Sequence, residues 1–145
     1  MRNKSQFTNK AMRATRHAAY EAALNKAYDA ARAAQRGAVE DPNALDCGFA
    51  WVVVYDISFM AWCRKKKAEM DTVVKQVPSG FSNAAILTGC DRYYGTKSTE
   101  TGRTFWKPGG FPGQAISIHE AGARAFRDTL THALQIRVEM GSRLD

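Results

Sequence analysis

The segment from Ser5 to about Arg36 contains neither glycine nor proline and is rich in alanine, the residue with the highest helix propensity. It predicts one long helix, for which Gly37 is a candidate C-cap and after which Pro42 prevents continuation. Small and apolar side chains recur along it at helical spacing, among them Tyr20, Leu24, Ala27, Tyr28 and Ala31. An alanine-lined stripe buries little area per residue. We therefore expect residues 1–37 either to pack closely or to remain partly detached as an arm.

The strongest strand signal follows at Gly48–Tyr55, where β-branched and aromatic residues dominate. Since both of its faces are apolar, we expect a central strand that is covered on both sides. A helix capped by Ser58 and running to about Met70 is expected next. From Ile136 to Met140, apolar residues alternate with charged ones, which favours a last strand with one solvent-exposed face.

The middle of the chain is less regular. Residues 72–77 fit a short strand, and residues 83–87 fit either a helical turn or an edge strand. Two aromatic segments, residues 91–95 and 103–107, flank a polar stretch that contains glycine. This pattern predicts a hairpin whose long tip is formed by residues 96–102.

Ser117 and Glu120 match a capping box, and apolar side chains recur at helical spacing from Ile118 to Leu134, which predicts another helix. Without the N-terminal helix, the order of elements is β-α-β-β-α-β. The length of 145 residues suits one domain of ordinary size. We therefore expect a ferredoxin-like α+β fold with an antiparallel sheet over residues 46–145. The N-terminal helix is expected to cover the face of the sheet that the other helices leave free.

Positive charge is concentrated in two predicted helical segments and one loop region, and the net charge of the chain is +7. Residues 1–36 carry eight basic and two acidic side chains, residues 61–76 carry five and two, and residues 77–110 carry four and two. Residues 37–60 carry four acidic side chains and no basic one. Such asymmetry raises the local concentration of an anionic partner. A surface that merely keeps the protein in solution explains the charge equally well.

No spacing of residues predicts catalysis or metal binding. His119 and His132 lie about 20 Å apart along one predicted helix at ~1.5 Å per residue, and His17 lies among basic residues. We expect these histidines to have surface or capping roles. The cysteines are far apart and form no CxxC pair: Cys47, Cys63 and Cys90. We therefore expect a non-enzymatic protein of the reducing cytoplasm, with no cofactor, no metal and no membrane contact.

The predicted hairpin combines aromatic with basic side chains, as is typical of surfaces that stack on nucleobases and contact phosphates. Because neighbouring residues of a strand point to opposite faces, one ring of each adjacent pair should face outward. We expect these rings to be Tyr94 and Trp106. Aromatic pairs that only stabilise the hairpin are the alternative interpretation.

Two other segments add candidate anion contacts. The glycine-containing loop from Lys107 to Gln114 leads to a predicted helix start, where backbone N–H groups can approach a phosphate, although a plain connection also explains it. The basic run on the preceding helix would add salt-sensitive affinity, or simply be solvated. The candidate ligand-binding residues are Arg64, Lys65, Lys66, Lys67, Arg92, Tyr94, Arg103, Trp106, Lys107, Gly109 and Gly110.

One resemblance rests on several short segments: Gly48–Val54, Tyr93–Gly95, Phe105–Gly109, Gly113–Gln114, Glu120–Phe126 and Gly141–Asp145. Through them, residues 47–145 resemble small proteins of tailed bacteriophages and prophages. The resemblance carries no motif of known role. It implies a host-cell context, in which small phage proteins often block a defence system or bind nucleic acid or nucleotides.

These observations favour a binding protein of phage type whose ligand is anionic, either nucleic acid or a nucleotide-like signal used in host defence. The expected location is the host cytoplasm. The alternative is a protein–protein inhibitor, or an oligomerising protein, that acts through its N-terminal helix on a host protein or on a second copy of itself.

Overall fold

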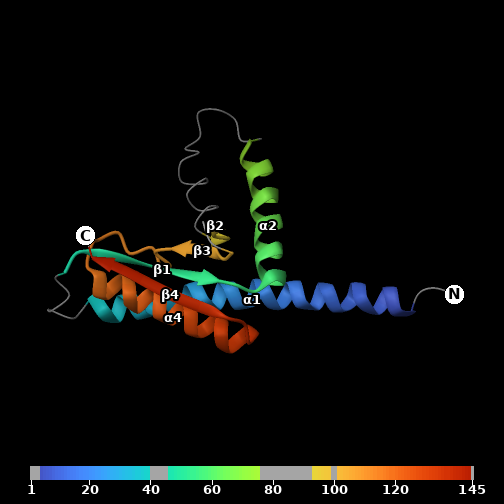
Figure 1. The fold of residues 1–145 in the computed structure, drawn as a ribbon, viewed down its shortest axis with the longest axis horizontal. Helices are drawn as coiled ribbons and strands as arrows, with labels where there is room; N and C mark the ends of the chain where they lie inside the picture. Colours follow the sequence, from blue (N-terminus) through green and yellow to red (C-terminus); the bar gives the residue numbers. More distant parts are fainter. Residues whose placement is uncertain (1–3, 40–45, 76–92, 99–100, 145) are drawn as a thin grey trace.

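The computed structural model describes residues 4–39, 46–75, 93–98 and 101–144. The helices and strands with defined bounds are α1 (Lys4–Val39), β1 (Gly48–Val54), α2 (Ile57–Lys75), β2 (Thr96–Lys97), β3 (Arg103–Trp106), α4 (Ile116–Leu134) and β4 (Val138–Leu144) (Figure 1). The strands form one antiparallel sheet in the order β2-β3-β1-β4. An α+β fold with a long N-terminal helix and a four-stranded antiparallel sheet is therefore confirmed.

Strand β1 lies at the centre of the sheet, between β3 and β4. Alternate side chains of β1 point toward the helices and are buried: Ala50, Val52 and Val54. The intervening residues, from Phe49 to Val53, point to the opposite face and are only half-buried. Val52 lies opposite Phe105 of β3 and Met140 of β4, so the register places apolar residues of all three strands over the helices.

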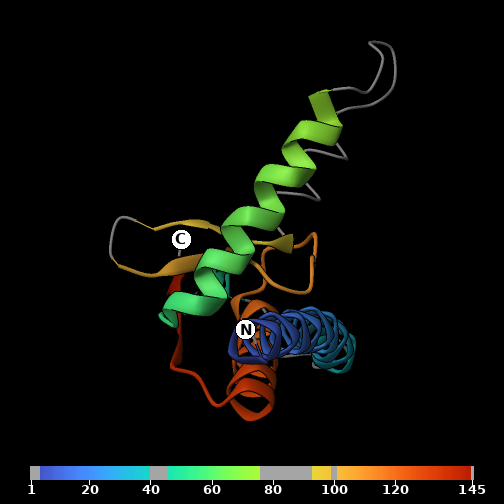
Figure 2. The same ribbon diagram turned by 90° about the vertical axis from the view of Figure 1, so that its right-hand side faces the viewer.

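The described helices contribute to one core on the same side of the sheet. Leu24 and Ala27 of α1, Phe59 of α2 and Phe126 of α4 are fully buried in one cluster with Phe105 of β3. Helix α1 runs alongside α4 and packs mainly against it (Figures 1 and 2). The expectation that the N-terminal helix covers the second face of the sheet is therefore wrong. Among the described residues, no helix lies on that face.

Small residues make the contact between α1 and α4 close. Ala27 and Ala31 of α1 are fully buried. A Cβ atom at Gly122 of α4 would lie 2.7 Å from the carbonyl oxygen of Pro108 and would collide with the side chain of Gln35. The buried Gln35 amide donates to the same carbonyl at 3.1 Å. The alanine-lined stripe therefore packs as closely as the sequence suggested.

The first part of α1 projects beyond the body of the molecule (Figure 1). Residues 9–16 are all exposed, whereas Tyr20 is buried in the core. The helix is thus closely packed along its second half and detached along its first half. No helix in the described part of the chain is both long and apolar enough to pass through a bilayer.

Two predicted helix caps are wrong. Gly37 lies inside α1, which continues past it. Helix α2 is capped by Asp56, whose carboxylate accepts the backbone N–H of Phe59 at 2.9 Å, and not by Ser58. Asp56 directly follows β1, so a carboxylate was available one turn before the first buried residue of the helix.

The predicted capping box of α4 is not formed. The N-cap is Ala115, which has no side-chain hydrogen bond, and Ser117 lies within the helix. The Glu120 carboxylate instead accepts the hydroxyl of Ser142 on β4 at 2.9 Å. The Glu120 side chain, which the capping box would need, is therefore bound to another element of the fold.

The second half of the sheet differs from the prediction in its boundaries. Helix α2 continues to Lys75, so the predicted strand at residues 72–77 is wrong in its described part. Residues 83–87 lie outside the described residues. Strand β2 occupies the start of the expected hairpin tip, and β4 extends beyond Met140 because its end pairs with the start of β1 at Gly48.

Candidate functional site

Three aromatic rings form a cluster on the face of the sheet away from the helices. The antiparallel register places Trp51 of β1 opposite Trp106 of β3, with their ring centroids 5.4 Å apart. Phe49, two residues before Trp51 on the same face, lies 5.8 Å from each indole. We call Phe49, Trp51 and Trp106 the aromatic triad. Aromatic side chains provide flat apolar surface for a planar ligand.

A glycine on the neighbouring strand allows the Trp51 ring to lie against the sheet. Gly141 of β4 is the register partner of Trp51. A Cβ atom on Gly141 would lie 2.6 Å from Cζ2 of the indole. Because glycine has no side chain here, the ring of Trp51 covers β4 instead of standing away from it.

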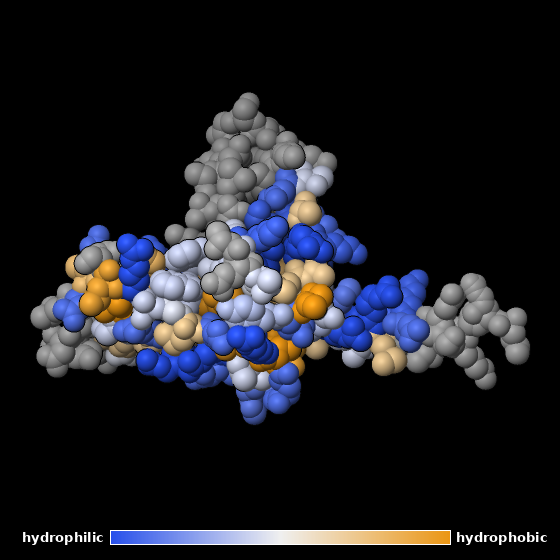
Figure 3. Space-filling view, viewed as in Figure 1, coloured by the Kyte–Doolittle hydropathy of each residue, from blue (hydrophilic) through white to orange (hydrophobic). Residues whose placement is uncertain are grey.

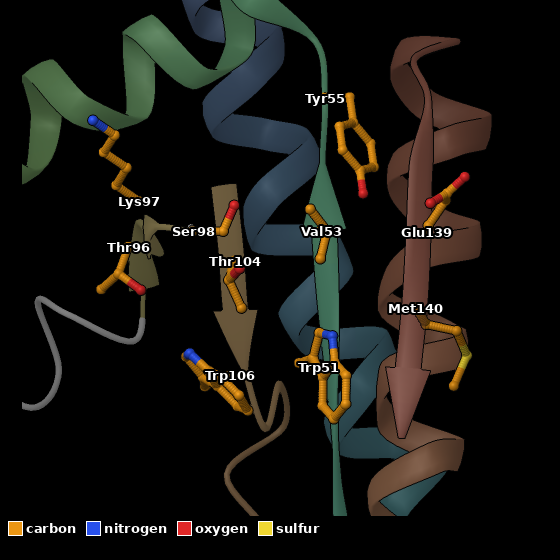
Figure 4. A pocket seen from close by; sticks show the side chains of 10 residues that line it. All are labelled: Trp51, Val53, Tyr55, Thr96, Lys97, Ser98, Thr104, Trp106, Glu139 and Met140. Atoms are coloured by element: carbon orange, nitrogen blue, oxygen red, sulfur yellow. The ribbon is translucent and has the colours of Figure 1, made fainter. Parts of the chain in front are cut away.

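A hollow of about 440 Å³ opens beside the triad (Figure 4). Side chains from all four strands line it: Trp51, Val53, Tyr55, Thr96, Lys97, Ser98, Thr104, Trp106, Glu139 and Met140. The indole of Trp106 is 47% exposed. This volume is within the range of small-ligand sites, and the hydroxyl of Thr104 adds polar capacity among apolar walls.

Cationic groups outnumber carboxylates around this face. Arg137 lies over the ring of Tyr55, with Cζ 4.4 Å from the centroid, and its guanidinium is 3.1 Å from the carboxylate of Glu139. Lys97 lines the hollow, and Arg143 is the register partner of Phe49. The Lys97 side chain itself runs toward α2 (Figure 4). Among the described residues, Arg137 and Arg143 therefore place positive charge near this face, although Arg137 is paired with Glu139, and such an excess favours an anionic ligand.

A second hollow, of about 180 Å³, lies on the other side of Trp106. It is lined by Tyr28, Arg32, Tyr93, Trp106, Lys107, Gly109 and Gly110. Three of these residues have positive φ angles: Lys107 at 45°, Gly109 at 102° and Gly110 at 71°. The chain thus turns tightly around the hollow, and two cations border it: Lys107, and Arg32, which is paired with Asp29 at 2.5 Å. Trp106 lines both hollows.

The structure places only part of the predicted hairpin site together. Trp106 and Lys107 are exposed at the junction of the two hollows. The expected exposure of Tyr94 is wrong, because this residue is 9% exposed and its ring packs against Trp62 in the core. Arg103 is also buried, and its guanidinium donates to the carbonyl oxygens of Tyr94 at 2.6 Å and Gly95 at 2.8 Å.

A turn explains the burial of Tyr94, and strand alternation explains that of Arg103, which lies two residues before the buried Phe105. Tyr94 precedes β2 and lies in a turn, where strand alternation does not apply. Gly95 has a φ angle of 72°, and the turn directs two carbonyl oxygens toward Arg103. Burial lowers the pKa of the Arg103 guanidinium. Arg103 therefore stabilises the turn and does not face a ligand.

The remaining predicted residues lie apart from the triad. Arg64 and Lys65 are exposed on α2, and the following lysines, Lys66 and Lys67, lie 3.8 Å and 3.5 Å from Glu69 and Asp71 respectively. None of the four lines either hollow beside Trp106. In the glycine loop, Gly109 faces the side chain of Gln35, whereas Gly110 is open. Arg92 lies outside the described residues.

Sequence reasoning missed the contribution of β1 and β4 to this site. Trp51 was assigned to a strand covered on both sides, and Gly141 was not considered. Alternation along Gly48–Val54 was the available signal, because it places Phe49 and Trp51 on one face. Pairing with Trp106 depends on the register, which one sequence does not reveal.

Side chains with acid–base or thiol chemistry are used elsewhere in the fold. His119 is buried and its Nε2 donates to the carbonyl oxygen of Gly113 at 2.8 Å. It is therefore neither a surface nor a capping residue as expected. Burial raises the pKa of the Cys63 thiol to about 12, which removes its nucleophilic form at neutral pH. Within the described ranges, His, Cys, Asp and Glu side chains form no group of three or more that could hold a metal ion.

No match was found in comparisons with protein-family models, curated proteins and solved structures.

Proposed function

We propose that this chain is a non-enzymatic binding protein for an anion that carries a nucleobase, either single-stranded nucleic acid or a nucleotide. The observation that carries the proposal is the half-exposed Trp106, held in an aromatic triad on the sheet face that none of the described helices covers, with cationic side chains near it. Stacking of a base on an exposed aromatic ring contributes about 1–3 kcal/mol.

The two hollows suggest how such a ligand would lie. A base would stack on Trp106 in the larger hollow, where the hydroxyls of Thr96 and Thr104 are available to its polar edge. Its phosphate would lie in the smaller hollow, where Lys107 supplies positive charge and Arg32, now paired with Asp29, would contribute further donors. In this arrangement Trp106 separates the apolar part of the site from the charged part.

The proposal includes a ferredoxin-like arrangement, a phage origin and a role against host defence. A ferredoxin-like β-α-β-β-α-β arrangement is supported by the antiparallel pairing of β1 with β3 and of β1 with β4. A sheet of this kind with a free face resembles the platform on which RNA-recognition modules stack bases. A phage origin, and the capture of a nucleotide signal of host defence, would give such a binder its biological role.

Fluorescence titration with a mixed single-stranded oligonucleotide and a panel of nucleotides tests the proposal. Trp106→Ala should weaken binding by about 5- to 150-fold, the equivalent of the ~1–3 kcal/mol lost with one stacked base. Trp106→Phe should retain most of the affinity, because it keeps a ring. The matched control is Ile57→Ala, which removes an exposed apolar side chain on α2. Equal affinity of wild type and Trp106→Ala, or no binding of any probe at low salt, would overturn the proposal.

A second candidate function rests on the projecting half of α1. Residues 9–16 are exposed on a helix that extends beyond the body, as expected for an arm that docks on a host protein or a second copy. Sedimentation of the full chain, compared with a chain lacking residues 1–16, tests self-association. A monomer in both cases would eliminate docking on a second copy, and a host-protein partner would then require a direct binding assay.

A further inference from the structure

The two basic segments of the sequence, far apart along the chain, meet in space. Helix α2 rises from the side of α1 at the point where α1 leaves the body (Figures 1 and 2). Aromatic contacts fix this junction: the ring of Tyr20 on α1 lies 5.3 Å from Phe59 and 5.7 Å from Trp62 on α2. The angle between the two helices is thus held by buried side chains and not by surface contacts alone.

A hollow of about 240 Å³ lies in this angle. It is lined by Arg13, Arg16, His17, Tyr20, Ser58, Ala61, Trp62 and Lys65. We call this group the basic angle. On the face shown in Figure 3, hydrophilic side chains predominate on the projecting part of α1 and are mixed with hydrophobic ones along α2.

Both helices direct positive charge at the same point. The pKa of His17 is lowered, first by burial and then by repulsion from cations, in the order Lys65, Arg13, Arg16 and Lys66. Two nearby carboxylates have other partners: Asp56 caps α2, and Glu69 lies 3.8 Å from Lys66. Glu21, four residues after His17, has one buried carboxylate oxygen without a hydrogen-bond partner, but it does not line the hollow. Like charges from two helices therefore accumulate in one hollow, where a bound anion would relieve their repulsion.

We infer that the basic angle binds phosphate groups of a nucleic-acid backbone, as a second surface independent of the aromatic triad. Cations on two converging helices can contact successive phosphates, which is how proteins bind nucleic acid without reading bases. A docking site for a folded protein is expected to have an apolar, aromatic-rich centre with few lysines. Here three of the four exposed lining side chains are cationic, namely Arg13, Arg16 and Lys65. The large exposed apolar residues of this region, Met12 and Ile57, do not line the hollow.

A blunt-ended DNA duplex is the appropriate probe, because its paired bases are not available for stacking on Trp106. The test variant replaces three cations of the basic angle: Arg13→Gln, Arg16→Gln and Lys65→Gln. The control variant removes the same charge from exposed positions elsewhere on α1 and α4: Lys26→Gln, Arg36→Gln and Arg124→Gln. All six side chains are exposed, so both variants should fold, which thermal melting verifies.

Fluorescence anisotropy at several salt concentrations provides the readout. The test variant should lose at least about tenfold in duplex affinity, and its log–log salt slope should become shallower by about 2–3, because each phosphate contact contributes about 0.9. The control variant should change the slope by less than about one. An equal loss of duplex affinity in both variants would show that only the net charge of the protein matters, and would overturn the inference.

Two further measurements distinguish binding at the basic angle from binding at the aromatic triad. Trp106→Ala should bind the duplex as wild type does, so failure of either surface leaves the other testable. In the wild-type protein, NMR titration should show that duplex raises the pKa of His17, since phosphate offsets the repulsion from the surrounding cations. An unchanged His17 pKa would contradict the inference, and so would polyglutamate that binds the basic angle as tightly as duplex.

Discussion

Arg103 and Trp106 show how neighbouring residues of one short strand serve different purposes. Both were expected to face a ligand, yet the Arg103 guanidinium is buried and bonded to two carbonyl oxygens while the Trp106 indole faces outward. Strand alternation explains the exposure of Trp106. The same alternation places Arg103 on the helix side with Phe105, and the turn at Gly95, which no periodicity reveals, supplies the carbonyl oxygens that its guanidinium needs there.

Replacement of Arg103 should destabilise the fold. Arg103→Met removes the donors to the carbonyl oxygens of Tyr94 and Gly95 and leaves both oxygens buried without them. We expect the free energy of unfolding in urea to fall by about 2–3 kcal/mol, the cost of leaving such groups unsatisfied. Lys97→Met, at the exposed register partner of Arg103, should change it by less than about 0.5 kcal/mol. Equal stability of the two variants would contradict the role assigned to Arg103.

Protonation of His17 should make stability depend on pH. Its folded-state pKa lies below the ordinary value of 6.5, because of burial and then of Lys65, Arg13, Arg16 and Lys66. The unfolded chain therefore binds more protons near that pH, and the free energy of unfolding should fall as pH drops below 6.5 toward the folded pKa.

Urea unfolding of wild type and His17→Gln across this pH range measures the effect. The variant should lose part of the dependence, because glutamine does not titrate. His132→Gln, at an exposed position of α4, is the matched control and should behave as wild type. A stability that rises on acidification in wild type, and not in His17→Gln, would contradict the predicted sign.

At the scale of elements, sequence patterns predicted those helices and strands whose extent depends on the residues of one segment. Strand β1 and helix α4 were predicted within a residue or two, because composition and helical spacing are properties of one segment. The capping box of α4 was predicted wrongly, because the Glu120 carboxylate is bound by Ser142 from another element. Pairing of Trp51 with both Trp106 and Gly141 is set by sheet register, so the sequence named one member of the triad and missed its neighbours.

The close approach of α1 and α4 provides a test at the same scale. Gly122→Leu would place a side chain where Gln35 and the carbonyl of Pro108 now lie. We expect α1 to be displaced and the free energy of unfolding to fall by about 1–3 kcal/mol, as for overpacked cores. Arg124→Leu, at an exposed position of the same helix, is the control. Thermal or urea unfolding measures the difference in stability. A Gly122→Leu variant as stable as its control would show that the packing of α1 on α4 does not require a glycine at this position.

For the whole molecule, the sequence predicted the amount of charge but not its geometry. Residues 1–36 and 61–76 were recognisably basic, yet only the junction at Tyr20 and Trp62 places their cations around one hollow. The same holds for the face of the sheet that none of the described helices covers. Helix α1 packs on α4 instead of covering this face, and Gly122 and the buried alanines allow that close contact.

The most direct test of the account follows the indole N–H resonances of the chain's three tryptophans by ¹⁵N NMR during titration with a short single-stranded oligonucleotide. Trp51 and Trp106 lie on the open face, whereas Trp62 is buried beside the basic angle. The account predicts large shifts for Trp106 and Trp51 that saturate together with binding. Saturable binding that moves Trp62 alone, or leaves all three resonances in place, would contradict it.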